Sequence, residues 1–469
     1  MKNLNFSQHY ILFAIVLSIS IVSVSSCKKQ DNFLDVKSNK SDVTPKTLQD
    51  YQSILDNTQV MNGYGSILGL VGTDNIYIPD ANLDGSAQTS RNSYLWLQDI
   101  YQGGIAFDWY YAYQEVEYAN IVLDGLKSIS NSEQPAIYNN IKGSALFYRA
   151  YAFYQLSQLY CKQFDSNSAA QDLGIPLRTS SDVNAKFTRA TVKESYAQII
   201  NDLLAAEQLL PKVPLFKTRP SGPASDALLA KVYLSMSDYT NGGIYADKAL
   251  QVNASLLNYN NLVIGRANPF PTFQKGNPEV IFHAATYGLT EVIGASSVKA
   301  RVDPALFESY ENGDLRRAAF FVADGATGLY KFKGSYTATP YNFCGIANDE
   351  LILIRAECSA RTGNLSSSLS DLNKLLQNRY TPSTFVAFST TARTELISKI
   401  ITERRKEMPY TGNIRWDDLK RLNMETSYAK TLNRTSHGIL YTLNINDPRY
   451  IYPLPNDEIQ LNKLIQNAR

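Results

Sequence analysis

Apolar side chains recur at helical spacing along most of this chain. A first helix is expected to begin at Thr44, which suits an N-cap, and Pro45, which suits the first helical position. From Asp108 the helical period continues for about 55 residues, as expected of an antiparallel helix pair. Other stretches with this period are residues 224–250, 349–376 and 391–423. The pattern therefore predicts a chain built mainly from helices.

Small and aromatic residues alternate within these stretches. Ala145, Ala150 and Ala152 lie between large rings, so that neighbouring helices can approach closely. The stretch 224–250 has tetratricopeptide-like spacing with residues 241–243 as a turn, and Gly363 suits a helix C-cap. We therefore expect a mainly α fold: a tetratricopeptide-like helical repeat scaffold with long irregular loops and a few short strands.

Two regions interrupt the period. Residues 63–104 mix Gly, Asn, Asp, Ser and aromatic residues without order, which predicts a long loop. Residues 255–345 favour irregular structure with a few short strands, one of them at 280–282. Long loops held by a rigid scaffold are often functional, so residues 63–104 form the candidate binding loop.

The N-terminus has the pattern of an export signal. Lys2 precedes an apolar stretch from Tyr10 to Val24, and two serines then lead to Cys27. This stretch is shorter than the roughly 20 residues of a membrane-spanning helix. A cysteine after small residues is typical of bacterial lipoproteins, so we expect cleavage before Cys27 and acylation, for example with palmitate, of that residue.

These patterns suggest three parts of the chain. Residues 1–26 are the expected signal peptide and residues 27–41 a lipidated tether. Residues 42–469 are expected to form a single domain, with an N-terminal half to residue 250 and a C-terminal half from residue 251.

Composition excludes several classes of function. The chain has 45 basic and 43 acidic residues without a basic block, so nucleic acid is not an expected partner. His283 and His437 lie apart from each other, so no metal site is expected. Apart from Cys27, the chain has three cysteines, Cys161, Cys344 and Cys358, whose irregular spacing predicts buried small side chains. The chain has 31 tyrosines, a residue type that is enriched at recognition surfaces.

The acidic residues near the C-terminus could suggest a glycosidase, which needs two carboxyl groups. Glu403 and Glu407 lie on one helical face, and Asp417 and Asp418 follow. Arginine and lysine alternate with the glutamates, so we expect ion pairs between helices. No enzyme motif is recognised and no cofactor is expected.

Several segments together resemble the SusD/RagB family of surface lipoproteins that serve glycan and nutrient uptake. They include Cys27 with its tether, Arg149-Ala150-Tyr151, and the strongest one, Glu403 to Glu407 followed by Gly412. The other matching segments are residues 119–123, 174–177, 353–364, 415–421 and 452–459. The stretch 408–410 departs from the family pattern, and the chain is compact for the family.

The resemblance implies a function of capture without chemistry. A lipid-anchored protein would bind oligosaccharide at the outer membrane, facing outward, and deliver it to a TonB-dependent outer-membrane transporter like SusC. The implied fold is the helical scaffold, and the implied partner surface lies largely on the helical repeats. Peptide in place of oligosaccharide, a surface glycosidase, and an assembly scaffold without ligand stay open as alternatives.

Ligand-binding residues are expected in the loop 63–104 and on an opposite wall. Aromatic rings can stack on sugar faces while polar side chains hydrogen-bond the hydroxyls. The candidates are Asp74, Asn75, Tyr77, Tyr94, Trp96, Tyr101, Tyr287, Arg316 and Tyr330. Trp96 could equally fill the core, and Arg316 could pair with Asp314 or Glu308.

Overall fold

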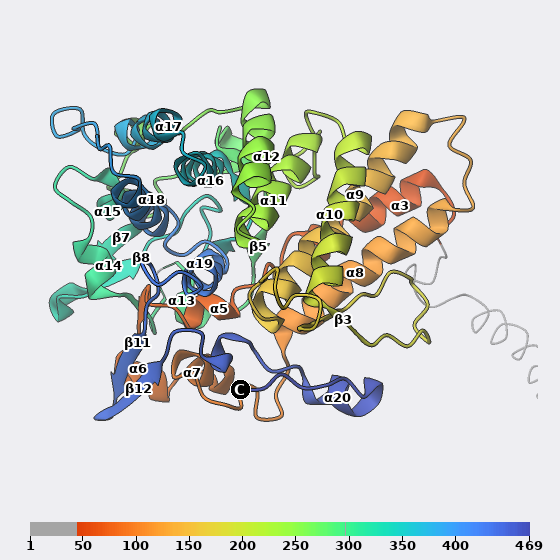
Figure 1. Cartoon of the computed structure of the whole chain (residues 1–469), viewed down its shortest axis with the longest axis horizontal. Coiled ribbons are helices and arrows are strands. Elements are labelled where there is room, and N and C mark those ends of the chain that lie inside the picture. The colour runs from red at the N-terminus through yellow and green to blue at the C-terminus, as the bar shows by residue number, and fades with distance from the viewer. Residues whose placement is uncertain (1–44, 296) are drawn as a thin grey trace, which may run out of the picture. The chain divides into compact units, whose positions relative to one another are not determined.

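Packed helices form the main part of the structure, a computed structural model that describes residues 45–295 and 297–469 (Figure 1). Contacts group Thr47–Arg469 into one unit. The described residues form 18 α-helices, whereas the strands have only two to five residues, so the expected mainly α, tetratricopeptide-like fold is confirmed. The longer helices are α3 (Leu48–Leu55), α8 (Phe107–Leu126), α9 (Pro135–Tyr160), α10 (Val192–Leu209), α11 (Gly222–Ser235), α12 (Tyr239–Val252), α16 (Asn348–Arg361), α17 (Leu365–Gln377), α18 (Arg393–Glu407) and α19 (Ile414–Leu422).

These helices pack in the order of the chain. Each helix from α8 to α12 contacts the next one, and α16 contacts α12, α17 and α18. Small residues allow close approach, since Ala145, Ala150 and Ala152 are fully buried on α9. A Cβ at Gly125 of α8 would lie only 2.1 Å from the hydroxyl of Tyr51 on α3. The alternation of small and large residues therefore fixes the spacing of the helices.

Two predicted helix boundaries are wrong. Helix α3 begins at Leu48 after Thr47, which forms a capping box with Asp50, so Pro45 precedes the helix and does not take its first position; Thr44 lies outside the described residues. The expected turn at residues 241–243 lies inside α12. Gly242 faces Cys358 of α16, where a Cβ would be 3.0 Å from the sulfur, so this glycine serves close packing. Gly363, by contrast, follows α16 with φ of 96°, as predicted for a C-cap.

The region 63–104 is more regular than expected. It contains the helices α5 (Leu68–Val71), α6 (Asp80–Asp84) and α7 (Gln88–Tyr94) and the strand β1 (Ile76–Tyr77), and α4 (Thr58–Met61) precedes it. Each of these helices has at most seven residues, too few to show a hydrophobic period in the sequence. Most of the buried apolar side chains of α5, α6, α7 and β1 enter a second hydrophobic core, whereas Leu68 belongs to the core among the long helices.

Residues 255–345 form short paired strands and single helical turns, as expected. Strand β4 (Val280–Phe282), which was predicted, pairs with β10 (Ile346–Ala347), and β5 (Ala285–Thr286) pairs with β9 (Asn342–Phe343). The other pairs are β1 with β6 (Arg301–Val302), β7 (Phe321–Ala323) with β8 (Tyr330–Phe332), β2 (Leu173–Pro176) with β3 (Arg189–Thr191), and β11 (Leu432–Ser436) with β12 (Ile439–Leu443), all antiparallel. The remaining short helices are α13 (Thr290–Ile293), α14 (Pro304–Glu308), α15 (Leu315–Phe320), α20 (Asn456–Asn462), and the 3-10 turns η2 (Tyr259–Asn261), η3 (Phe273–Lys275), η4 (Gly325–Thr327) and η5 (Pro448–Tyr450).

The cysteines lie where the sequence predicts them. Cys161, Cys344 and Cys358 are free thiols buried in the hydrophobic cores. Burial raises the pKa of the Cys161 thiol to about 11, and it raises the pKa values of the other two thiols as well. These cysteines therefore behave as small apolar side chains.

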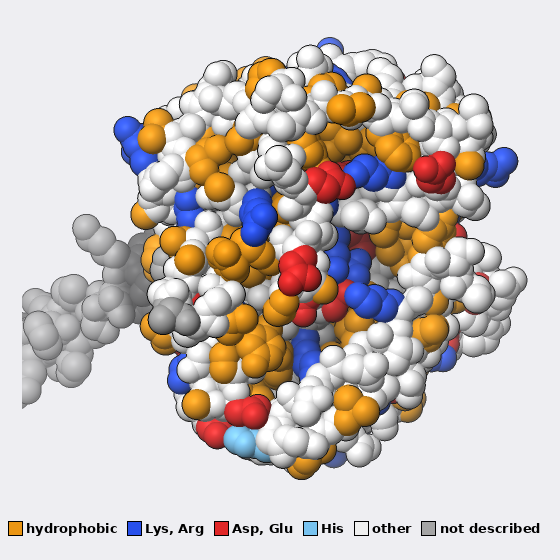
Figure 2. Space-filling model, turned by 90° about the vertical axis from the view of Figure 1, so that its left-hand side faces the viewer, with side chains coloured by type: hydrophobic (Ala, Val, Ile, Leu, Met, Phe, Trp, Pro, Cys, Tyr) orange, Lys and Arg blue, Asp and Glu red, His pale blue; other side chains and the backbone are white. Residues whose placement is uncertain are grey.

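Charges of both signs are mixed on the surface. Figure 2 shows lysine and arginine side chains beside acidic ones around a hollow on one face of the molecule. This mixture agrees with the formal net charge of only +2. Within the described part of the chain, no helix combines the length and the apolar character that a bilayer span requires.

Candidate functional site

The polar candidates of the predicted binding loop, Asp74 and Asn75, are engaged in structural contacts. Asp74 accepts hydrogen bonds from Arg415 at 2.8 and 2.9 Å and from Lys430 at 2.8 Å. Burial opposes ionisation, but Arg415 and Arg405 hold the pKa of Asp74 well below its usual range. Asn75 is fully buried and donates to the carbonyl oxygen of Pro409 at 2.8 Å. These two residues join the segment before β1 to the last helix pair, so they do not face a ligand.

Three of the four aromatic candidates of this loop, Tyr94, Trp96 and Tyr101, lie inside the protein, contrary to the expectation that they stack on a ligand. Trp96 is 2% exposed and donates its indole N–H to the carbonyl oxygen of Gly72 at 2.9 Å. The guanidinium of Arg434 lies 4.4 Å from the Trp96 ring and 3.8 Å from the Tyr94 ring. Tyr101 is also buried, and its hydroxyl contacts that of Tyr160 at 3.1 Å. The physical reason is that Arg434 lies over the rings of Tyr94 and Trp96, and that all three rings belong to the hydrophobic cores.

Arg316 does not form the wall of a cleft. Its side chain is fully buried and pairs with Asp314 at 2.7 Å, Glu403 at 2.5 Å and Glu407 at 3.0 Å. Pairing with Asp314 and ion pairs between helices were both anticipated from the sequence, and the structure confirms them. Arg379 extends the same network to Glu407 at 2.6 Å. Glu403 and Glu407 therefore hold α18 to its neighbours.

Three candidates remain accessible: Tyr77, Tyr287 and Tyr330. Tyr77 lies on β1 and is 37% exposed. The half-buried ring of Tyr330 on β8 stacks on Phe307 with centroids 3.5 Å apart. Tyr287, directly after β5, is 38% exposed, and it belongs to a larger aromatic cluster.

Six aromatic side chains from four parts of the chain form a cluster that includes Tyr287. The rings of Tyr64 and Tyr111 stack with centroids 3.6 Å apart, and Tyr287 contacts Tyr64 edge-on at 5.6 Å. The ring centroids of Tyr341 and Tyr287 lie 4.5 Å apart. The set, named here the tyrosine ridge, consists of Tyr64, Phe107, Tyr110, Tyr111, Tyr287 and Tyr341.

Backbone pairing brings these residues together. Tyr64 forms a β-bridge with Thr286, and the Tyr287 N–H donates to the Gly63 carbonyl oxygen at 2.8 Å. A Cβ at Gly63 would lie 2.4 Å from the Tyr287 ring, so only glycine leaves room for this ring. Strand β9, which begins one residue after Tyr341, pairs with β5.

The first turn of α8 adds the rest of the ridge. Asp108 accepts hydrogen bonds from Ser66 Oγ at 2.6 Å and from the N–H groups of Ile67 at 2.8 Å and Leu68 at 3.1 Å. These bonds fix the start of α8 against the chain that follows Tyr64. Phe107 and Tyr110 then point outward, exposed by 51% and 56%.

The ridge presents apolar ring faces with polar tips to the solvent. Burial and the neighbouring Tyr64 raise the pKa of the Tyr111 hydroxyl. Burial, Tyr341 and Tyr64 also raise the pKa of the Tyr287 hydroxyl. Both hydroxyls are therefore neutral near pH 7 and can donate or accept hydrogen bonds. Such a surface can hold a ligand that has apolar faces and hydroxyl or amide groups.

Of the six residues of the ridge, only Tyr287 was predicted from the sequence. One signal was present: Phe107, Trp109, Tyr110 and Tyr111 all lie in the first turns of one helix. A surface helix buries one face only, and on α8 that face carries Trp109, which is 4% exposed. The neighbouring rings must then lie toward the solvent.

Comparisons with known proteins agree with this architecture. A family model described as "Starch-binding associating with outer membrane" matches residues 32–234, and the model of the SusD family matches residues 349–468. No curated protein matches the chain significantly.

Solved structures of low sequence identity share the fold. A SusD superfamily protein from Bacteroides thetaiotaomicron has a TM-score of 0.73 at 21% identity, over 90% of this chain and 100% of that one. A SusD superfamily protein from Bacteroides vulgatus also has a TM-score of 0.73, at 18% identity, over 90% and 99% of the two chains. A SusD-like carbohydrate binding protein from the same species has a TM-score of 0.70 at 21% identity, over 89% and 97%. With two family models that together match more than half of its length, the chain belongs to the SusD/RagB family.

Proposed function

We propose that this protein captures oligosaccharide on the tyrosine ridge and delivers it to a TonB-dependent outer-membrane transporter. The observation that supports it is the set of accessible rings that four separate chain segments bring to one place. Of the residues expected from the sequence, Tyr287 belongs to this proposed site. Membership in the SusD/RagB family supports carbohydrate as the ligand class.

Sugar binding suits the ridge for a physical reason. The C–H face of a pyranose packs on an aromatic ring, and the hydroxyls at its rim need hydrogen-bond partners. Tyr64, Tyr111 and Tyr287 offer both within one cluster. Binding then requires no charged group at the ridge.

A binding experiment with matched variants tests the ligand site. The protein is purified in a detergent without a sugar headgroup and titrated with the oligosaccharides that a glycan and peptide array selects. Tyr110→Ala should weaken binding by about 1–3 kcal/mol if one ring stacks on one sugar, by analogy with other planar ligands. Ile439→Ala, which removes an equally exposed apolar side chain (56%) from strand β12, is the control and should leave the affinity unchanged.

Two results would reject the site. Equal affinity of Tyr110→Ala, Tyr287→Ala and the unaltered protein would place the ligand elsewhere. If the array selects only peptides, the ligand is a peptide and not an oligosaccharide. The assignment of the fold is unaffected by this result.

The proposal includes a lipid anchor at Cys27, which lies outside the described residues. A cysteine after an export signal supports it, because two or more acyl chains hold a protein stably at a membrane. Cys27→Ala should move the protein from the membrane fraction to the soluble fraction without loss of thermal stability. Unchanged membrane retention would reject the anchor.

The transporter partner is tested separately. The detergent-solubilised protein, isolated by an affinity tag, should retain a large outer-membrane barrel. Recovery without such a barrel would count against delivery and would leave ligand capture untouched.

A further inference from the structure

Three large apolar side chains lie in the solvent within the connection between α10 and α11. Val213, Leu215 and Phe216 are 76%, 72% and 56% exposed. This connection, residues 211–219, is named here the apolar loop. Single exposed apolar residues are common on protein surfaces, whereas three of them within four positions form a patch of the kind that marks contact with a partner.

Hydrogen bonds at its base fix the apolar loop on the domain. The Gly222 N–H donates to the carbonyl oxygen of Pro211 at 3.0 Å, which closes the loop. The carbonyl oxygen of Thr218 accepts from Tyr148 Oη at 2.7 Å and from Asn62 Nδ2 at 3.0 Å. The base is therefore held by α9 and by the end of α4, while the apolar tip stays exposed.

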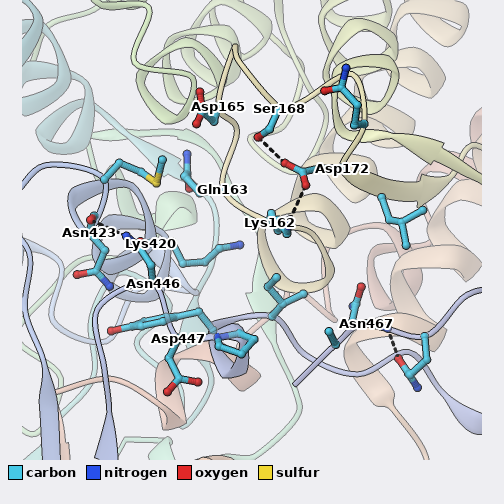
Figure 3. A pocket seen from close by; sticks show the side chains of 18 residues that line it. Lys162, Gln163, Asp165, Ser168, Asp172, Lys420, Asn423, Asn446, Asp447 and Asn467 are labelled. Carbon is cyan, nitrogen blue, oxygen red and sulfur yellow. Dashed lines mark hydrogen bonds and ion pairs between the residues drawn. The ribbon is translucent and has the colours of Figure 1, made fainter.

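Two lysines flank the tip, and neither forms an ion pair with another described residue. Lys212 is exposed, whereas Lys217 is half-buried. Burial lowers the pKa of the Lys217 ammonium, with no acidic neighbour in the described part of the chain to offset the effect. Figure 3 shows the more common arrangement beside the cavity after α9, where Lys162 pairs with Asp172 at 2.6 Å. The apolar loop therefore carries positive charge that an anionic partner can neutralise.

The apolar loop lies beside the point where the N-terminal segment joins the domain. Arg219 of the loop pairs at 2.6 Å with Asp56, which follows α3. The same arginine lines a surface hollow together with Leu48, the first residue of α3. The segment that carries Cys27 enters the domain directly before this helix. Residues 27–46 span at most about 70 Å when fully extended, so an anchor at Cys27 keeps this edge of the domain near the membrane.

From these observations we propose that the apolar loop is a second membrane contact. Val213, Leu215 and Phe216 enter the outer part of a lipid bilayer, and Lys212 and Lys217 meet its phosphate headgroups. An apolar tip with flanking lysines suits the boundary between acyl chains and headgroups. The contact orients the domain, because a tether alone leaves it free to rotate.

A bilayer fits both features of the loop better than a protein partner does. Its acyl boundary takes apolar side chains, and its phosphates meet ammonium groups at any position along the surface. In a protein contact, a half-buried ammonium needs a carboxylate at one fixed place, or its burial costs free energy. The tether raises the local concentration of the loop at the membrane, so a weak contact is sufficient. This last step rests on the proposed anchor at Cys27, whereas the contact itself can be measured without it.

A fluorescent probe on the tip tests the contact. In the full chain with Cys27→Ala, which carries no acyl chain, Leu215→Cys is labelled with an environment-sensitive dye. The labelling is selective because the cysteines of the described residues are buried. With vesicles of phosphatidylcholine and phosphatidylglycerol, the dye emission should shift to shorter wavelength. The same dye at Ile439→Cys, another exposed apolar position on β12, should show no shift.

Removal of charge tests the headgroup contact. Lys212→Gln/Lys217→Gln in the Cys27→Ala chain should weaken vesicle binding, measured by co-sedimentation, by about 10- to 30-fold. The matched control Lys186→Gln/Lys193→Gln removes two exposed lysines at the other end of α10 and should keep the affinity of the Cys27→Ala chain. Thermal unfolding checks that each variant is folded.

An unshifted emission of the Leu215→Cys probe in the presence of vesicles overturns the proposal, and so does equal vesicle affinity of the two lysine double variants. A shift that requires added outer-membrane proteins assigns the loop to a protein partner and overturns it as well. None of these measurements uses an acylated chain, so their outcome does not depend on whether Cys27 carries the proposed anchor.

Discussion

The rings of Tyr64 and Tyr111 stack with centroids 3.6 Å apart and planes 9° apart, although one lies before β1 and the other in the first turns of α8. This contact joins a segment that pairs with residues 285–287 to the helical scaffold. The stack therefore holds the ridge together at the point where its segments meet.

Removing both rings should reveal coupling between them. A double-mutant cycle with Tyr64→Ala, Tyr111→Ala and the double variant should give a coupling of about 0.5–1.5 kcal/mol in the free energy of unfolding in urea. Tyr64 and Ile439 do not touch, so the effects of Tyr64→Ala and Ile439→Ala on the free energy of unfolding should be additive. A coupling no larger than in this control would show that the stack contributes nothing beyond burial.

Gly63 should be needed for ligand binding although it carries no side chain. In Gly63→Ala the new Cβ would lie 2.4 Å from the Tyr287 ring and 2.5 Å from the carbonyl oxygen of Gln59. The backbone oxygen cannot move aside easily, so Tyr287 should shift and the affinity for oligosaccharide should fall severalfold. Gly265→Ala is the control, because no atom lies within 4 Å of its Cβ position. Equal titration curves for the two variants would remove Tyr287 from the site.

The long helices could be predicted because their signal is local. In α8, α9, α16 and α18 the hydrophobic period extends over at least 14 residues, and caps such as Gly363 mark the ends. The helices α5 to α7 have no such signal. Distant groups hold them, for example Asp108, which accepts hydrogen bonds from the N–H groups of Ile67 and Leu68.

The candidate site was harder to predict because ring exposure depends on distant residues. Trp96 lies in a polar, aromatic stretch that resembles a binding loop, but Arg434 from the C-terminal hairpin covers its ring. Tyr64 and Tyr341, conversely, carry no local signal and become part of the ridge only through backbone pairing. A single sequence does not show which segments pair across more than 200 residues.

Trp96 should therefore be essential for stability and not for binding. Trp96→Ala removes a ring that is 2% exposed, takes one of two aromatic partners from Arg434, and removes the indole donor to the Gly72 carbonyl oxygen. We expect a loss of about 3–5 kcal/mol in the free energy of unfolding, measured in urea. The affinity for oligosaccharide should stay unchanged at temperatures where the variant is folded. Weaker binding at unaltered stability would instead return Trp96 to the ligand site.

Asp417 should make the stability of the protein fall as the pH rises. Burial, with smaller effects of Asp418 and Glu350, raises the pKa of Asp417 to about 7 against the attraction of Lys420 and Lys231. The unfolded chain loses this proton near pH 4, so between about pH 4 and pH 7 the folded state binds more protons and becomes less stable with increasing pH. Asp417→Asn cannot ionise and should remove this loss.

Urea unfolding between about pH 5 and pH 7.5 measures the effect. This range stays below the pKa of Lys420, which burial lowers to about 8 and whose titration would act in the opposite direction at higher pH. The stability of Asp417→Asn relative to the unaltered protein should increase across the range, whereas Glu133→Gln, at an exposed position, should show no trend. A constant difference for Asp417→Asn would mean that Asp417 is already ionised at pH 5, and that Lys420 and Lys231 outweigh the cost of its burial.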